Sequence, residues 1–367
     1  MKPLRITIDA VPVLVRSAGV KNYIYHWLKH LRRQAAASGA GAEIRVFPRL
    51  GDLGRLNHDA STLGAWTTIS RLAAVQAANL LGPGAARLLA GRPDVFHASN
   101  QVQYAPKGSL LTATLHDMTA YLMPELHTSG NVESDRRFFE HTVPRADGLI
   151  AVSESTRADA IRVLGLSPDR VTTIHSGVAE EYFDAPKTTR PRPYALFVGT
   201  IEPRKNLNTL LDAWALLKAD LRREFDLVFA GPAGWAAKAT LERIRAEAAY
   251  LGYVPEAELP GLTAGATAFL YPSLYEGFGF PVAQAMAAGV PVVTANVSSL
   301  PEITAGAALL VDPRSPSDLA AAISRVLESA ELRRNLSARG RAAAERYRWE
   351  RCAEESMEFF GRVASRR

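Results

Sequence analysis

Short apolar runs alternate with amphipathic stretches along nearly the whole chain, and this alternation most restricts the fold that the chain can adopt. The runs at residues 110–115 and 194–198 have the length of buried strands. Residues 20–33 instead have helical periodicity, with Tyr23 and Trp27 on one face. Strands that alternate with helices indicate βα units and parallel sheets, so the sequence predicts an α/β protein.

A polar connector rich in proline and basic residues, at 184–193, divides this pattern into two parts. The alternation restarts immediately after it. The 367 residues are too many for one ordinary domain and suffice for two. We therefore expect two doubly wound domains, residues 1–187 and 188–345, that face each other across a cleft. Ligands of such sheets bind beyond the carboxyl ends of the strands.

Composition excludes several classes of protein. The single cysteine, Cys352, excludes an intramolecular disulfide and a Cys/His zinc site, and it fits a reducing compartment. Asp9 interrupts the first apolar run, so a signal peptide is not expected. The long uncharged stretch between Glu276 and Glu302 is broken by glycines and prolines, which predicts a loop, a helix, a turn and a strand instead of a membrane span. We expect a cytoplasmic protein, either soluble or peripheral on the inner face of the membrane.

The N-terminal part is basic. The net charge is +6, and residues 1–100 hold 13 Lys and Arg against 5 Asp and Glu. An anionic partner explains this excess, either a phosphate-bearing substrate or an anionic membrane surface, against which residues 61–90 with Trp66, Arg71 and Arg87 would lie. The alternatives are a solvated basic face without a partner and an ordinary packed helix pair. No nucleic-acid-binding signature is present, so nucleic acid is not expected as a partner.

The segment Val198 to Asn206 combines three features of an anion site. Gly199 lets a ligand approach the backbone where a strand ends. Arg204 and Lys205 place two cations just before a helix N-terminus, which itself attracts anions. Together these features predict a segment that binds a diphosphate; the alternative is a solvated basic turn.

Glu276 lies in a glycine-flanked loop between the end of a strand and a helix that starts at Pro281. Gly277 and Gly279 expose backbone N–H groups beside it. This arrangement predicts a carboxylate that accepts hydrogen bonds from two sugar hydroxyls. The alternative is a carboxylate that only stabilises the helix N-terminus.

His116 and Gly19 are the candidates in the first half of the chain. His116 follows the strand at 110–115, where it can donate to a ligand hydroxyl or carbonyl, unless it is a structural histidine. Gly19 precedes a helix and would let phosphate approach. The chain lacks a G-x-G-x-x-G fingerprint, a phosphate loop and a D-x-D pair. Nucleotide hydrolysis and a diphosphate-bound metal are therefore not indicated, and Arg204 and Lys205 would neutralise the phosphates.

Taken together, these motifs resemble the retaining, family-four glycosyltransferases of the GT-B fold over nearly the whole chain. The matching parts occur in the family's order: the Gly19 loop, TLHD (114–117), AVSEST (151–156), IHSGV (174–178), VGTIEPRKN (198–206), GYV (252–254) and EGFGFP (276–281). The segment around Arg204 looks like that of bacterial mannosyltransferases, which favours mannose from GDP-mannose.

The resemblance implies two Rossmann-like domains, the first for an acceptor and the second for a nucleotide-sugar donor. Residues 346–367 would form a helix that crosses back to the first domain. The implied catalytic residues are His116, Arg204, Lys205 and Glu276. The implied donor-binding residues are Gly19, Gly199, Tyr253, Val254, Phe278, Gly279, Phe280 and Gln284.

One position departs from the family's pattern. Where the family usually has a second glutamate that binds the nucleotide ribose, this chain has Gln284. Glutamine still forms hydrogen bonds, but loss of the charge weakens binding by about 1 kcal/mol. A weakened or altered nucleotide preference follows.

The activity that the resemblance implies is the retaining transfer of a hexose from a GDP- or UDP-sugar to a hydroxyl of a sugar or lipid-linked sugar acceptor. It would serve glycan, glycolipid or polysaccharide biosynthesis and need no cofactor or divalent metal. Two alternatives stay open: a non-catalytic nucleotide-sugar-binding protein, and a GT-B-type epimerase of UDP-sugars.

Overall fold

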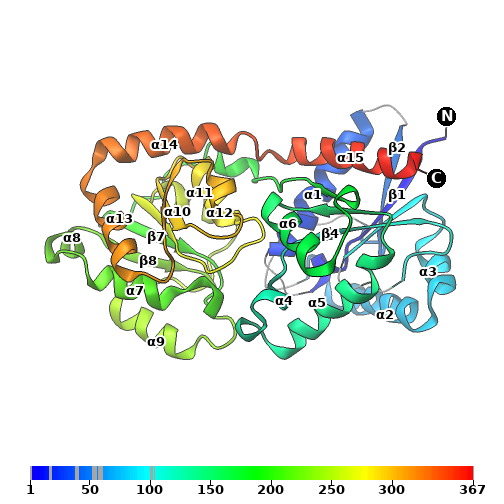
Figure 1. The fold of residues 1–367 in the computed structure, drawn as a ribbon, viewed down its shortest axis with the longest axis horizontal. Helices are drawn as coiled ribbons and strands as arrows, with labels where there is room; N and C mark the ends of the chain where they lie inside the picture. Colours follow the sequence, from blue (N-terminus) through cyan, green and yellow to red (C-terminus); the bar gives the residue numbers. More distant parts are fainter. Residues whose placement is uncertain are drawn as a thin grey trace. The chain divides into compact units, whose positions relative to one another are not determined.

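The computed structural model describes residues 2–15, 19–37, 41–51, 56, 61–99, 102 and 104–366. It divides the chain into two compact units (Figure 1). Unit 1 comprises Met1–Gly177 together with Trp349–Arg367, and unit 2 comprises Val178–Arg348. The change from unit 1 to unit 2 thus lies before the predicted boundary between residues 187 and 188.

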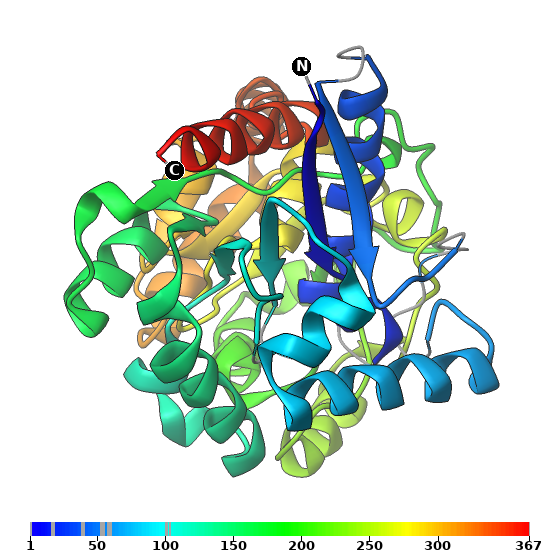
Figure 2. The same ribbon diagram turned by 90° about the vertical axis from the view of Figure 1, so that its right-hand side faces the viewer.

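Unit 1 is built on a six-stranded parallel sheet with the order β2-β1-β3-β4-β5-β6. Figure 2 shows β1 and β2 side by side in blue. Strand β2 pairs with one side of β1, and strands β3 to β6 follow on the other side, so the strand order reverses between β1 and β3. The strands are β1 (Leu4–Asp9), β2 (Ala42–Phe47), β3 (Val95–Ala98), β4 (Leu110–Leu115), β5 (Gly148–Ala151) and β6 (Val171–Thr173).

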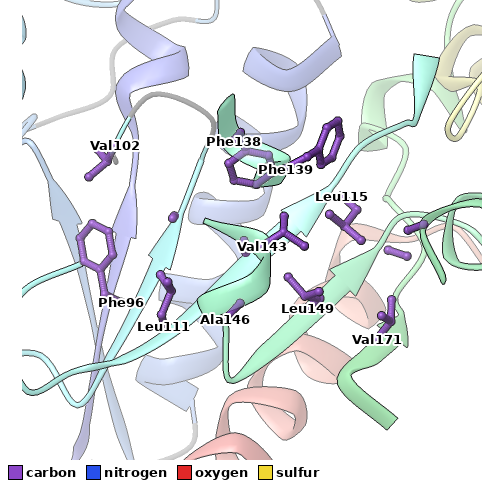
Figure 3. Packing of buried hydrophobic residues seen from close by; sticks show 14 of the residues in the cluster. Phe96, Val102, Leu111, Leu115, Phe138, Phe139, Val143, Ala146, Leu149 and Val171 are labelled. Carbon is purple, nitrogen blue, oxygen red and sulfur yellow. The ribbon is translucent and has the colours of Figure 1, made fainter. Parts of the chain in front are cut away.

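Helices cover this sheet, and a core of apolar side chains fills the space between them. In Figure 3, Phe138 and Phe139 from a helix lie over Leu115 and Leu149 from two neighbouring strands. Burial on both faces explains why these strands are nearly continuous apolar runs. The α-helices of the first part of unit 1 are α1 (Gly19–Ala37), α2 (Ala65–Leu81), α3 (Pro83–Ala90), α4 (Thr119–Leu122), α5 (Ser129–His141) and α6 (Glu154–Leu164).

The last helix of the chain, α15 (Trp349–Ser365), belongs to unit 1 and packs on α1. The indole Nε1 of Trp27 donates a hydrogen bond to Ser356 Oγ at 3.0 Å. The Trp349 ring lies 5.7 Å from the ring of Tyr23. Gly177 has no room for a side chain, because a Cβ there would lie 2.4 Å from the Trp349 ring. The C-terminal segment therefore completes the core of the first unit.

Unit 2 repeats this design with a second six-stranded sheet in the order β12-β11-β10-β7-β8-β9, again parallel throughout. The chain builds one side of β7 and then the other, so the order reverses between β7 and β10. Ligands of open parallel sheets bind at the carboxyl ends of the two strands that flank such a reversal. The strands are β7 (Tyr194–Val198), β8 (Asp226–Ala230), β9 (Ala249–Tyr250), β10 (Ala268–Tyr271), β11 (Val292–Ala295) and β12 (Ala308–Val311).

The helices of unit 2 complete the alternation of strands and helices, which confirms the predicted α/β fold. The stretch between Glu276 and Glu302 forms a loop, a helix, a turn and a strand, as predicted. Among the described helices, none combines the length and hydropathy needed to cross a bilayer. The α-helices are α7 (Leu207–Ala215), α8 (Ala219–Glu224), α9 (Lys238–Glu247), α10 (Leu259–Ala264), α11 (Phe280–Ala287), α12 (Leu300–Thr304), α13 (Pro316–Glu328) and α14 (Ala330–Ala344).

Candidate functional site

Two loops of unit 2 meet where the strand order reverses. One follows β7 and carries Arg204 and Lys205, and the other follows β10 and carries Glu276. Backbone contacts join the loops, because Leu274 N donates to Arg204 O at 2.9 Å and the Arg204 guanidinium donates to Tyr275 O at 2.7 Å. Residues far apart in the sequence are therefore held at one edge of the sheet.

The side chains of these loops form a cluster of two cations and two carboxylates. Lys205 Nζ lies 2.6 Å from Glu276 Oε1, and Arg204 Nη1 lies 3.0 Å from the same oxygen. Arg204 Nη2 also contacts Glu202 Oε1 at 2.8 Å. The exposed fractions are 13% for Arg204, 8% for Lys205 and 10% for Glu276. This segment is thus a buried charged cluster and not a solvated basic turn.

Two polar side chains that the sequence analysis did not single out complete the cluster. The Tyr271 hydroxyl accepts a hydrogen bond from Lys205 Nζ at 2.8 Å and donates to Glu276 Oε1 at 3.1 Å. Ser273 Oγ donates to the same carboxylate oxygen at 2.7 Å. Both residues lie at or just after the carboxyl end of β10, and this position is the sequence signal that could have identified them.

Charge and burial together determine the ionisation of this cluster. Burial alone would raise the pKa of the Glu276 carboxyl, but the charges of Arg204 and Lys205 and its hydrogen bonds lower that pKa to about 2. Burial and the neighbouring guanidinium lower the pKa of the Lys205 ammonium, and the two carboxylates oppose this shift. Glu276 is therefore ionised at neutral pH. The ammonium of Lys205 lies beside it and donates hydrogen bonds to both Glu276 and Tyr271.

The loop that carries Glu276 is fixed by two serines near the start of α12. Glu276 N donates to Ser298 Oγ at 2.9 Å, and Ser299 Oγ donates to the carbonyl oxygens of Glu276 and Phe278 at 2.9 and 3.0 Å. Gly279 then precedes α11 with a φ of 90°, a conformation that favours glycine. Gly279 therefore forms the turn that leads from the Glu276 loop into α11.

Phe278 and Gln284 are two further residues of unit 2 that the sequence analysis assigned to donor binding. The Phe278 ring packs edge-on against Phe280 and Tyr347, and its carbonyl oxygen accepts the hydrogen bond from Ser299. Gln284 is half-buried on α11, one turn beyond the start of that helix.

The carboxyl ends of β7 and β8 approach each other closely. Gly199 N donates to Ala230 O at 2.9 Å, and a Cβ on Gly231 would lie 2.0 Å from Gly199 O. Gly231 N donates in turn to Gly252 O at 2.7 Å. The turn with exposed Tyr253 and half-buried Val254 therefore lies at the same sheet edge as Gly199.

In unit 1, His116 follows β4 and contacts the helix that begins at Gly19. Its ring meets the Tyr23 ring edge-on, with centroids 4.9 Å apart, and Tyr23 lies on α1 one turn beyond Gly19. Burial lowers the pKa of His116 to about 4, opposed in part by Asp117. His116 is therefore a neutral imidazole at physiological pH.

A second buried group of unit 1 lies where the order of the first sheet reverses. Asp9 ends β1 and accepts hydrogen bonds from Val11 N at 3.0 Å and from Ser99 N at 3.1 Å, with the Ser99 hydroxyl as a further donor. Burial raises the pKa of Asp9 to about 6, although these hydrogen bonds oppose the shift. The sequence analysis used Asp9 only as a break in an apolar run and assigned it no site.

Within the described residues, no three His, Cys, Asp or Glu side chains are placed to hold a metal ion. Arg204 and Lys205 place two cations at the strand reversal of unit 2.

Comparison with known proteins extends this picture. Residues 178–343 match the family model described as glycosyl transferases group 1, and residues 17–182 match that of glycosyltransferase family 4. The chain is 35% identical over 259 residues to the O-antigen chain mannosyltransferase B of Escherichia coli, a match that covers 66% of this chain and 68% of that protein.

Solved structures share the fold at low sequence identity. Sucrose-phosphate synthase from Thermosynechococcus elongatus is 18% identical with a TM-score of 0.74, and the match covers 99% of this chain and 100% of that one. Anabaena HepE in complex with UDP-glucose is 17% identical with a TM-score of 0.67, and the match covers 97% and 99%. Both units therefore follow an architecture known from experiment.

Proposed function

This chain belongs to the family 4 glycosyltransferases of the GT-B fold, and we propose that it transfers a hexose from a nucleoside-diphosphate sugar to an acceptor hydroxyl with retention at the anomeric carbon. The observation that carries the proposal is the buried cluster of Arg204, Lys205 and Glu276 at the strand reversal of unit 2. In this cluster the two cations proposed to bind the diphosphate are each paired with the carboxylate proposed to bind the sugar hydroxyls.

In the proposed donor complex, Glu276 binds hydroxyls of the hexose. Its contacts with Lys205, Tyr271 and Ser273 all converge on Oε1, and Oε2 takes part in none of them. Because the carboxylate is ionised and held in place, Oε2 is suited to accept hydrogen bonds from sugar hydroxyls. The backbone N–H groups of Phe278 and Gly279, at the start of α11, are proposed to help bind the sugar.

The diphosphate is the proposed partner of Arg204 and Lys205. In the free protein each cation contacts a carboxylate, so the cluster of four charged groups is neutral overall. A donor diphosphate brings negative charge to this cluster, and more charge develops on it as the bond to the sugar breaks. Fixed cations in a site with little water stabilise that developing charge more strongly than solvent would.

The proposed chemistry needs no protein nucleophile. The bond between the anomeric carbon and the leaving phosphate oxygen breaks, and its electron pair stays on the diphosphate. The acceptor hydroxyl attacks the anomeric carbon from the same face, and its proton passes to the departing phosphate oxygen. His116, neutral at physiological pH, is proposed to donate a hydrogen bond to the donor sugar, and unit 1 to bind the acceptor.

We favour mannose as the transferred sugar and a growing polysaccharide or lipid-linked sugar as the acceptor. The support is the likeness to the O-antigen chain mannosyltransferase B, together with the motif around Arg204. Because Arg204 and Lys205 take the place of a cation on the diphosphate, we propose that transfer needs no divalent metal.

A panel of nucleotide sugars tests the proposal. GDP-mannose should raise the melting temperature more than UDP-, ADP- or TDP-sugars, and mass spectrometry should detect one added hexose on a mannoside acceptor. Proton NMR of the product should show the α-linkage of the donor. Tight binding without transfer would favour a nucleotide-sugar-binding protein, and conversion of a UDP-sugar without acceptor would favour an epimerase; either result contradicts the proposal.

A further inference from the structure

Helices α2 and α3 of unit 1 expose large apolar side chains to solvent. The exposed fractions are 86% for Trp66, 84% for Leu80 and 88% for Leu88. Isolated exposed apolar residues are ordinary, whereas a cluster marks a surface that binds something. Of the nine large apolar residues exposed in the described part of the chain, six lie on these two helices, namely Trp66, Ile69, Leu80, Leu81, Leu88 and Leu89.

The exposed residues of α2 form a stripe along one side of the helix. Trp66, Ile69 and Leu80 recur at helical spacing, whereas Val75 and Ala78 face the opposite side and are buried in the core of unit 1. The outward side of a helix that covers a sheet is normally polar. Figure 2 shows α2 and α3, in light blue and cyan, as neighbouring helices, so the six exposed residues lie on adjacent elements.

Positive charge accompanies this apolar surface. Residues 60–93 contain three arginines and no acidic residue. Exposed Lys107 adjoins the start of α3, because its backbone N donates to Pro83 O at 3.2 Å, and Arg87 on α3 donates to Lys107 O at 3.4 Å. The exposed leucines of α3 therefore lie on a helix that has two cations beside it, and residues 60–93 contribute no anion.

We propose that the α2–α3 surface docks on an anionic lipid membrane. The apolar stripe would enter the boundary between headgroups and acyl chains, and Arg87 and Lys107 would contact lipid phosphates. A helix of 17 residues is about 25 Å long, so α2 can lie flat along the membrane over several turns. The complete lack of acidic residues in this segment favours anionic lipid over a protein partner. This inference goes beyond the proposed function, because docking requires neither donor nor acceptor.

Co-sedimentation of the full chain with vesicles tests the proposal. The protein should bind vesicles of phosphatidylcholine with about 30% phosphatidylglycerol more strongly than vesicles of phosphatidylcholine alone, and salt should weaken the binding. Trp66→Ser with Leu80→Ser should lower the partition coefficient about tenfold or more. Arg87→Gln with Lys107→Gln should lower it about fivefold for each charge removed and reduce its salt dependence.

Leu216→Ser provides the matched control, because this leucine is 62% exposed in unit 2 and its loss should leave partitioning unchanged. All substituted positions are on the surface, and thermal unfolding will verify that each variant folds. Equal binding by wild type and the Trp66→Ser, Leu80→Ser variant would overturn the proposal, as would binding that ignores lipid charge or no binding at all. A dimer that this variant converts to a monomer, without vesicle binding, would show instead that the surface joins two copies of the chain. Transfer to a soluble acceptor, measured in parallel, separates failure of docking from failure of the proposed activity.

Discussion

Lys205 Nζ and Glu276 Oε1 lie 2.6 Å apart in unit 2, although 71 positions separate the two residues in the chain. The contact is buried, and the Tyr271 hydroxyl bonds both partners. It exists because β7 and β10 are neighbours in the sheet. An ion pair placed at this strand reversal joins the two ends of the proposed donor site, and most of the predictions below depend on it.

Removal of both cations should abolish transfer while the fold survives. Arg204→Ala with Lys205→Ala should lower kcat/KM by about 10²-fold to 10³-fold or more, because the charge that develops on the leaving diphosphate loses its stabilisation. Lys218→Ala is the matched control, since exposed Lys218 pairs with Glu328 at 3.0 Å, away from the loops that carry Arg204 and Glu276 in the sequence. Turnover close to wild type in the double variant, with an unchanged melting temperature, would defeat the assignment of these residues.

The depressed pKa of Glu276 makes stability depend on pH. A carboxylate with a folded pKa of about 2 and an ordinary value of 4.5 contributes stability above pH 4.5 and loses it as the pH falls towards 2. Between pH 5 and pH 3 the stability of wild type should therefore fall relative to that of Glu276→Gln by about 2 kcal/mol. Urea unfolding of both proteins at pH 5 and pH 3 measures the difference; parallel pH dependence in the two proteins would disprove it.

Asp9 should produce a pH dependence of the opposite sign. Its folded pKa of about 6 lies above the ordinary value of 3.8, so the folded state binds the extra proton, and the resulting stability is present below pH 3.8 and lost as the pH rises through 6. Asp9→Asn should therefore become more stable relative to wild type by up to about 3 kcal/mol between pH 4 and pH 7. Denaturant titrations of both proteins at pH 4 and pH 7 measure this change. If the difference in unfolding free energy between the variant and wild type were the same at both pH values, the raised pKa of Asp9 would be contradicted.

Position 284 should control the strength of donor binding. Gln284→Glu restores a charge that can accept hydrogen bonds from ribose hydroxyls, so the donor Kd should fall about fivefold, which corresponds to about 1 kcal/mol. Gln284→Ala should raise the Kd instead. Isothermal titration with the donor and with its free nucleoside diphosphate measures both changes. If the Gln284→Glu variant bound the donor no more tightly than wild type, residue 284 would not be a donor-binding residue.

A chelator should leave transfer unaffected. If Arg204 and Lys205 neutralise the diphosphate, EDTA will not change the initial rate, and added Mg²⁺ or Mn²⁺ will not raise it. The double variant without these cations provides the informative comparison, since partial rescue of its rate by Mg²⁺ would identify the missing charge as the cause of its defect. Loss of wild-type transfer in EDTA, restored by a divalent metal, would refute metal independence.

The strands were the most predictable part of the fold. Residues 110–115 and 194–198 form strands over the predicted ranges, because compact apolar runs between polar or glycine-containing segments have few other folded arrangements. The sequence analysis did not predict the edge strand β9. This strand has only two residues and forms through its pairing with β8, a tertiary contact that leaves no local pattern.

The candidate site was predicted in its residues but not in its contacts. Arg204, Lys205 and Glu276 could be named because each lies in a glycine-containing loop after a strand. Their burial and their mutual pairing depend on strand order, which the sequence pattern does not contain. Tyr271 was overlooked for the same reason: as the last residue of an apolar strand it has the pattern of a core residue, although its hydroxyl lies in the charged cluster.

The packing of α15 on α1 affects how the protein is made as well as how it is built. Trp349 and Ser356 complete the core of unit 1, so an emerging N-terminal half lacks part of its own interior until the ribosome has added the final helix. Until then the apolar face of α1 around Trp27 has no cover. We therefore expect a fragment of the first 177 residues to be less stable than unit 1 with α15, because the apolar face of α1 stays uncovered.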